Sequence, residues 1–160
     1  MGRASNGASP SQGRILAIDD TPANLAAFGV VLGPLGHRVD LATSGMQGLR
    51  LARETPYDLV LLDLRMPVMD GLETARRFRE QGFPGPILLM TAFEFSADEL
   101  RDLKTLEPVD FAAGLIRPEL LCAKVSGWLT LQISLRTWKA LAQELALEND
   151  RLRGMLQAQP

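Results

Sequence analysis

Asp63 is the residue whose surroundings most clearly indicate chemistry. It directly follows the apolar run from Leu59 to Leu62, which is typical of a buried strand in a parallel sheet. A carboxylate at the end of such a strand is costly to desolvate, so its presence there indicates a function. Two further carboxylates, Asp19 and Asp20, follow another short apolar run in the same way. The ends of the apolar runs are therefore the places to look for a site.

Short apolar runs alternate with amphipathic stretches from Arg14 onward, which predicts a succession of strands and helices. Pro22 suits the first turn of a helix, Gly33 and Pro34 would end that helix, and Ser96 is a suitable N-cap for a later one. Strands are predicted at 14–18, 39–42, 59–62, 86–90 and 111–116. Helices are predicted at 22–32, 45–54, 72–80 and 97–106, and from 118 to about 156.

Five strands that alternate with five helices predict a doubly wound α/β fold, because each parallel return needs a crossover. Ligands of such sheets bind outside the carboxyl ends of the strands. The residues expected there are Asp19, Asp20, Asp63, Thr91 with Ala92, and Arg117. Carboxylates suit Mg²⁺, while a hydroxyl and a cation can stabilise phosphoryl oxygens. We therefore expect phosphoryl transfer, with Asp63 as the nucleophile.

Composition limits what can surround this site. The chain has 160 residues, 46% of them hydrophobic, which is enough for one domain with a core and an appendage. With 17 basic and 19 acidic residues it has a formal charge of -2, which gives no case for nucleic acid or an anionic membrane. One cysteine, no apolar span and no secretory signal indicate a cytoplasmic protein. Residues 1–13 are expected to be a disordered leader.

Residues 14 to 118 resemble the receiver domain of two-component response regulators. The matching pieces, in order, are Ile18-Asp19-Asp20 with Pro22 and Asn24, Asp63 with Met66-Pro67 and Asp70-Gly71, Thr91-Ala92, and the basic residue before Pro118. The resemblance implies a flavodoxin-like sheet of order 2-1-3-4-5, similar to the chemotaxis response regulator fold. It also implies that Asp63 accepts a phosphoryl group from a histidine kinase or a phosphotransfer protein.

The resemblance assigns roles to the other residues as well. It implies that Asp20 and Asp63 bind Mg²⁺ through their side chains, Arg65 through its backbone carbonyl and Asp19 through water. Thr91 would shift toward the phosphoryl group, and Ala92 and Arg117 would complete the phosphate-binding part of the site. From their residue types, Asp70 with Gly71 is expected to form a turn that caps the next helix, and Asn24 to be structural. Arg76, Arg77 and Arg79 are expected to form a solvated helix face.

Two positions depart from the family pattern. Arg117 stands where the family normally has Lys, and a planar guanidinium is not equivalent to a compact ammonium at a crowded site. Gly114 stands where the family usually has Tyr or Phe, so the usual aromatic readout of phosphorylation cannot operate from that position. These departures bear on the consequence of phosphorylation rather than on the acceptor.

The C-terminal segment 131–157 carries a heptad pattern that follows a receiver domain at 14–130. The a and d positions of this heptad seam are Leu131, Leu135, Trp138, Ala142, Leu145, Asn149, Leu152 and Leu156. The lone Asn149 falls at an a position, which favours a parallel two-stranded coil, and Glu148 at g could pair with Arg153 at e of the other chain. We expect a parallel homodimer, and the alternative is a helix that folds back on its own domain or frays.

Three functions are consistent with these observations. The first is a phosphorylated receiver, not an enzyme beyond its own phosphotransfer and dephosphorylation, which signals through the dimeric helix to an output domain absent from this chain. The second is a constitutively dimeric pseudo-receiver scaffold. The third is a phosphatase of the haloacid dehalogenase type. Such phosphatases carry a second Asp two residues after the nucleophile, but Arg65 occupies that position here.

Overall fold

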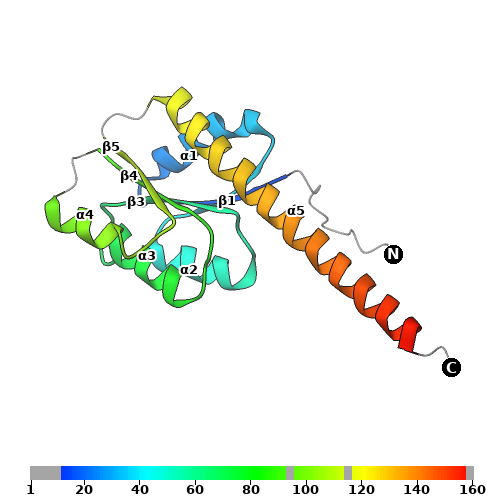
Figure 1. Ribbon diagram of the computed structural model, residues 1–160. Coiled ribbons are helices and arrows are strands. Elements are labelled where there is room, and N and C mark those ends of the chain that lie inside the picture. Colours follow the sequence, from blue (N-terminus) through cyan, green and yellow to red (C-terminus); the bar gives the residue numbers. More distant parts are fainter. Residues whose placement is uncertain (1–11, 93–95, 114–116, 158–160) are drawn as a thin grey trace, which may run out of the picture.

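The structure, a computed structural model, describes residues 12–92, 96–113 and 117–157. Its five parallel strands form one sheet of order β2-β1-β3-β4-β5, which confirms the predicted topology (Figure 1). The strands are β1 Arg14–Ile18, β2 Arg38–Ala42, β3 Leu59–Asp63, β4 Ile87–Thr91 and β5 Val109–Ala113. The helices are α1 Pro22–Leu32, the 3₁₀ turn η1 Gly33–Leu35, α2 Gly45–Glu54, α3 Gly71–Glu80, α4 Ala97–Leu103 and α5 Pro118–Gln157.

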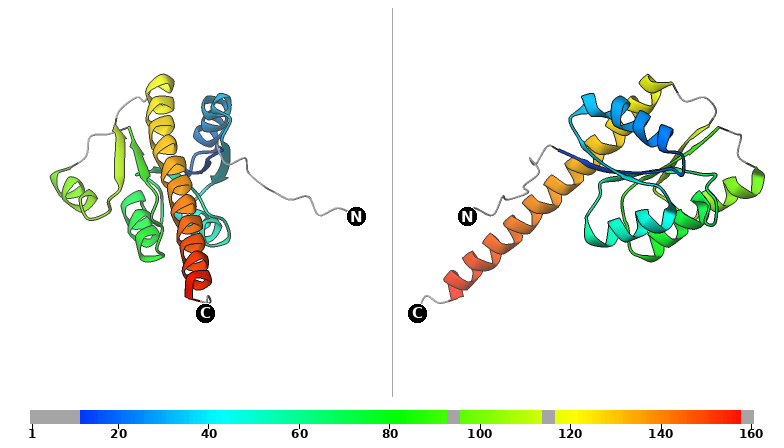
Figure 2. Two further views of the ribbon diagram at one scale, coloured as in Figure 1. Left: turned by 45° about the vertical axis from the view of Figure 1, so that its right-hand side comes forward. Right: turned by 180° about the vertical axis from the view of Figure 1, so that it is seen from behind.

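Helices cover both faces of the sheet, α1 and α5 on one and α2, α3 and α4 on the other (Figures 1 and 2). The core therefore has two halves. Leu59 and Leu61 of β3 contribute to the half under α1 and α5, and Val60 and Leu62 to the half under the other helices. All four side chains are fully buried. Burial on both faces is the physical reason for the uninterrupted apolar run that precedes Asp63.

The prediction of the fifth strand at 111–116 was wrong by two residues. β5 pairs with β4 from Ile87–Val109 to Thr91–Ala113, and residues 114–116 lie outside the described part of the chain. Asp110 interrupts the apolar pattern at the start of the true strand. Its carboxylate accepts hydrogen bonds from Lys124 Nζ at 2.8 and 2.9 Å and from Trp128 Nε1 at 3.2 Å. These hydrogen bonds from α5 satisfy the carboxylate of Asp110. The apolar pattern alone gave no reason to place such a residue in a strand.

The predicted helix at 97–106 ends at Leu103 in the structure. Leu106 is still buried, because a turn after the helix returns its side chain to the core. The apolar spacing of the sequence therefore continues beyond the last helical residue, which is why the predicted helix was too long. The predicted N-cap is confirmed: Ser96 Oγ accepts the backbone N–H of Glu99, and Glu99 Oε2 accepts the backbone N–H of Ser96.

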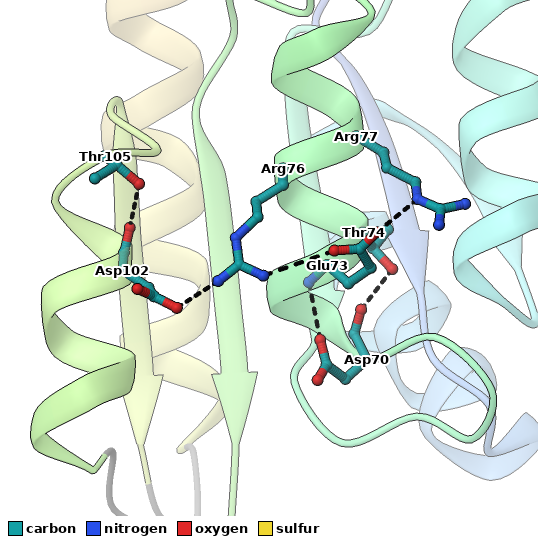
Figure 3. A network of polar contacts seen from close by, with 7 residues as sticks. All are labelled: Asp70, Glu73, Thr74, Arg76, Arg77, Asp102 and Thr105. Carbon is teal, nitrogen blue, oxygen red and sulfur yellow. Dashed lines mark hydrogen bonds and ion pairs between the residues drawn. The ribbon is translucent and has the colours of Figure 1, made fainter.

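Polar contacts join α3 to its own first turn and to α4 (Figure 3). Asp70 caps α3 as predicted, because its Oδ1 accepts the N–H of Glu73 at 2.8 Å. Arg77 Nε bonds to Glu73 within the helix at 2.8 Å. Arg76 forms ion pairs with Glu73 and with Asp102 of α4. Arg76 on the surface of α3 therefore also contacts α4.

Arg79 does not belong to a solvated face, so that prediction was wrong for this residue. Its half-buried guanidinium donates hydrogen bonds to four backbone carbonyls, those of Phe83, Gly85, Leu106 and Pro108, at 2.7 to 2.8 Å. Burial lowers the pKa of Arg79. Two of these carbonyls belong to the segment before β4 and two to the segment before β5. The side chain of Arg79 therefore links the end of α3 to both segments.

Helix α5 packs on the sheet through Leu121, Val125 and Leu129 and then extends beyond the domain (Figure 2). Arg136 Nη1 lies 3.1 Å from Oδ1 of Asp58, the residue before β3, and that carboxylate also accepts the N–H of Arg14. From residue 137 to residue 155 every described side chain of α5 is exposed. None of the described helices is long and apolar enough to cross a bilayer.

Candidate functional site

Three carboxylates meet at the carboxyl ends of β1 and β3. Asp19 and Asp20 directly follow β1, and Asp63 is the last residue of β3. One oxygen of each carboxylate lies within 4.8 Å of the others. β1 and β3 are adjacent in the sheet, and Ile18 pairs with Leu62, so the residues that follow them are necessarily close. The structure thus brings together the three acids that the sequence predicted at one site.

Asp19 is held in place by neighbouring donors. It is buried, and its Oδ1 accepts the backbone N–H of Thr21 at 2.8 Å. Asn24 in the first turn of α1 donates its side-chain amide to both Asp19 oxygens, at 3.2 and 3.0 Å. Sequence reasoning assigned Asn24 a structural role but did not identify this contact. The contact could have been inferred because Asn24 lies five residues after Asp19, in the first turn of a helix that begins at Pro22.

The surroundings of Asp63 raise its pKa to about 6 from a usual value of 3.8. Burial is the largest cause, followed by the negative charges of Asp19 and Asp20. Hydrogen bonds from the backbone of Arg65 and Leu64 oppose the shift. Clustered carboxylates raise each other's cost of ionisation, so a cation among them would lower the pKa of Asp63.

The loop from β3 to α3 approaches the site closely enough to require glycine. A Cβ on Gly71 would lie 2.5 Å from the carbonyl oxygen of Asp63 and 2.7 Å from the Cα of Leu64. The N–H of Gly71 donates to the carbonyl of Leu64 at 2.9 Å. In the same loop Val68 is fully exposed at a φ of 70°, a left-handed conformation that costs energy for a β-branched residue.

Of the other predicted site residues, two lie at the end of the neighbouring strand β4 and one lies just before α5. Thr91 ends β4 and is buried, and Ala92 follows it with an exposed side chain. Arg117 precedes α5, its side chain is exposed, and its carbonyl accepts the N–H groups of Leu120 and Leu121. Its described contacts thus place it at the start of α5. Gly114 lies outside the described residues.

Arg65 makes a contact that sequence reasoning missed. Its side chain reaches α4, where Nη2 lies 2.8 Å from Oε1 of Glu99. Glu99 is the residue whose other oxygen caps α4 through Ser96, and these hydrogen bonds lower its pKa. The loop after Asp63 and the first turn of α4 are therefore joined through one carboxylate. The sequence pattern cannot indicate this contact, because Arg65 and Glu99 are 34 positions apart in the chain.

The residues present fit a magnesium ion. Carboxylate oxygens are the hard ligands that Mg²⁺ prefers, and three of them come within reach of one ion here. After burial, the negative charges of Asp19 and Asp20 are the main causes that raise the pKa of Asp63, and a divalent cation would relieve this repulsion.

Fold and site together define a doubly wound α/β domain with a cluster of carboxylates at its strand ends. In a comparison with known protein families, the response regulator receiver domain family matches residues 15–125 of this chain. The chain therefore belongs to the response regulator receiver domain family. Members of this family are signalling modules that bind Mg²⁺ at an acidic cluster and interact with histidine kinases or phosphotransfer proteins.

Two curated relatives show the range of proteins that contain similar segments. The transcriptional regulatory protein ZraR of Klebsiella oxytoca is 36% identical over 103 residues, which cover 61% of this chain and 23% of that protein. The sensor histidine kinase GacS of Pseudomonas protegens is 32% identical over 125 residues, which cover 75% of this chain and 14% of that protein. The chain thus spans less than a quarter of either relative.

A solved structure bears on the metal. The receiver domain of the sensor histidine kinase PA1611 from Pseudomonas aeruginosa PAO1 is 30% identical, with a TM-score of 0.65. The match covers 74% of this chain and 98% of that domain. That domain was solved with a magnesium ion coordinated in its active site cleft.

Proposed function

We propose that this chain is a phosphorylation-controlled receiver that accepts a phosphoryl group on Asp63. The observation that carries the proposal is the carboxylate cluster at the ends of β1 and β3, in which Asp63 ends the strand. The donor would be a histidine kinase or a phosphotransfer protein, which the family relationship supports. The only catalysis expected of the chain is its own phosphorylation and the hydrolysis of its own acyl phosphate.

In the proposed reaction a carboxylate oxygen of Asp63 attacks the phosphorus of the donor as the bond to the donor nitrogen breaks. Asp63 must be ionised for this attack, and a pKa of about 6 leaves it mostly ionised at pH 7.5. Asp20, Asp63 and the carbonyl of Arg65 would hold Mg²⁺, with Asp19 bound through water. The ion would neutralise charge on the phosphoryl oxygens.

Residues at the end of β4 and just before α5 would bind the phosphoryl group. The hydroxyl of Thr91 would donate a hydrogen bond to one phosphoryl oxygen, the backbone of Ala92 would support another, and Arg117 would supply positive charge. Arg117 in place of Lys, together with Gly114, favours the competing interpretation of a scaffold that does not switch. The two interpretations differ in whether a phosphoryl mimic changes the protein.

Titration with beryllofluoride distinguishes them, because this ion imitates a phosphoryl group on a carboxylate. With Mg²⁺ present, we expect the amide resonances of Thr91 and of the residues after Asp63 to shift in the wild type. The Asp63→Asn variant should show no such shifts. A wild-type spectrum that beryllofluoride leaves unchanged would favour the scaffold.

We also propose that α5 mediates a parallel homodimer that passes the signal to an output domain. Large apolar side chains of the seam are exposed, with 48% of Leu131, 68% of Trp138, 57% of Leu145 and 49% of Leu152 accessible. Burial of such a stripe against a second helix is the usual reason for a heptad pattern. The side chain of Leu156 lies outside the described residues.

A further inference from the structure

Arg65 connects Asp63 to α4 through two different parts of one residue. Its backbone N–H donates a hydrogen bond to the carboxylate of Asp63, beside a similar bond from Leu64. Its guanidinium contacts a second carboxylate, with Nη2 at 2.8 Å from Oε1 of Glu99 in the first turn of α4. Arg65 therefore lies between the carboxylate that would be phosphorylated and a helix from a distant part of the chain.

The carboxylate of Glu99 has more contacts than a helix cap needs. Its Oε2 accepts the backbone N–H of Ser96 at 2.7 Å, which completes the capping box of α4. Its Oε1 pairs with Arg65, and only 14% of the Glu99 side chain is accessible. Asp98, the neighbouring acid of the same turn, is 88% accessible and pairs with Arg101 of its own helix. The contact of Glu99 with Arg65 is thus not required for the cap of α4.

Helix α4 has its own attachments to the rest of the domain. Leu103 at its end and Leu106 just after it are buried in the core. Asp102 forms an ion pair with Arg76 of α3 (Figure 3). These contacts hold the backbone of α4 in place, and with it the backbone of Glu99. Glu99 can therefore serve as a fixed partner for a side chain of the loop after β3.

The loop after β3 depends on contacts with its surroundings. Val68 is fully exposed at a φ of 70°, and a strained conformation of this kind persists only where neighbouring structure fixes it. The N–H of Leu64 donates to the carbonyl of Met90 in β4 at 2.8 Å, which attaches the start of the loop to the sheet. The ion pair with Glu99 attaches the next residue, Arg65, to α4. Loss of that pair would leave the backbone of Arg65 less firmly placed.

We propose that Glu99 is a positioning residue of the phosphorylation site. It holds the side chain of Arg65, and so it fixes the backbone N–H that Asp63 accepts and the backbone carbonyl that would bind Mg²⁺. Glu99 itself touches neither the phosphoryl group nor the ion and acts only through Arg65. This inference rests on the proposed function, because it assigns a role at the same site.

Titration with Mg²⁺, followed through the amide resonances of residues 64–66, tests the inference in the full chain. We expect Glu99→Gln to weaken Mg²⁺ binding about threefold, a modest effect because the ion pair is partly exposed. The glutamine keeps an oxygen that can accept the N–H of Ser96, so α4 stays capped. Asp98→Asn is the matched control, because it also removes one negative charge from the first turn of α4, and it should leave the affinity unchanged.

Arg65→Met separates positioning from a simple effect of charge. If Glu99 positions the loop, Arg65→Met also weakens Mg²⁺ binding, although it removes a positive charge next to the site. Unchanged or tighter binding by Arg65→Met would overturn the inference, because an unpaired guanidinium that merely repels the ion would then explain the effect of Glu99→Gln. In the double variant we expect a loss no larger than that of the more affected single variant. Two losses that multiply would overturn the inference too.

The outcomes keep this inference apart from the proposed function. If the wild type binds Mg²⁺ and Glu99→Gln binds it as tightly as Asp98→Asn does, the inference is overturned and the proposed function stands. A wild type that binds no Mg²⁺ and shows no shifts with beryllofluoride would overturn the proposed function, and this inference with it.

Discussion

Asn24 shows how one neutral side chain can organise an acidic site. Its amide donates to both oxygens of the buried Asp19, which fixes that carboxylate beside Asp20 and Asp63. Loss of a side chain that orients a metal-binding group typically costs 10- to 100-fold in affinity. We therefore expect Asn24→Ala to weaken Mg²⁺ binding about tenfold in a calorimetric titration. Gln47→Ala, which removes an exposed amide bound to Thr43, should leave the affinity unchanged.

The raised pKa of Asp63 predicts a pH dependence of stability. Since the folded-state pKa of about 6 lies above the usual 3.8, Asp63 favours the folded state when protonated, and this contribution is lost as the pH rises through 6. In the presence of a chelator, the wild type should lose about 1 kcal/mol of unfolding free energy between pH 5 and pH 7.5, after allowance for solvent screening.

Urea unfolding at the two pH values checks this effect. Asp63→Asn should lack this component of the pH dependence and be the more stable protein at pH 7.5 without metal. Adding Mg²⁺ should reduce or reverse the advantage of the variant. A variant less stable than the wild type at pH 7.5 in chelator would contradict the conclusion that burial and the charges of Asp19 and Asp20 disfavour the ionised Asp63.

The sequence was sufficient to predict the acids of the site but not the groups that orient them. Asp19, Asp20 and Asp63 were predictable because each comes at the end of a short apolar run, and parallel strands end at one edge of the sheet. The bond from Asn24 to Asp19 and the ion pair of Arg65 with Glu99 depend on side-chain directions that spacing does not specify.

At the scale of elements, Arg79 links α3 to the segments that precede β4 and β5 through four carbonyls. Arg79→Met would remove one hydrogen bond from each carbonyl, although the Pro108 carbonyl would keep the N–H of Ile87, and the loss should cost about 3 kcal/mol of unfolding free energy. Arg77→Met on the same helix is the control, because Arg77 is exposed and its ion pair is with Glu73 of its own helix. Its cost should stay within about 0.5 kcal/mol. Equal losses in chemical denaturation would contradict this role of Arg79.

Helices and strands were predicted correctly where the pattern of apolar residues covers the same residues as the element itself. β3 was placed correctly to within one residue, because both of its faces are buried and its run is uninterrupted. β5 was misplaced because Asp110 stands inside the strand and is satisfied by Lys124 and Trp128 on a helix later in the chain. A tertiary contact of this kind overrides the local pattern.

At the scale of the whole molecule, α5 presents exposed leucines of two kinds. Leu145 lies on the proposed seam and is 57% exposed, whereas Leu147 lies at the outer f position and is 67% exposed. We expect Leu145→Glu to convert the dimer to a monomer in light scattering and Leu147→Glu to leave the dimer intact. A wild type that is monomeric at micromolar concentration would contradict the proposed assembly.

The most direct test of the central claim is phosphorylation with acetyl phosphate, followed by intact mass spectrometry. The wild type should gain the mass of one phosphoryl group in the presence of Mg²⁺ and gain none in chelator. Asp63→Asn should gain none under either condition. A wild type that is never modified, or an Asp63→Asn protein that is modified to the same extent, would contradict the assignment of Asp63 as the phosphoacceptor.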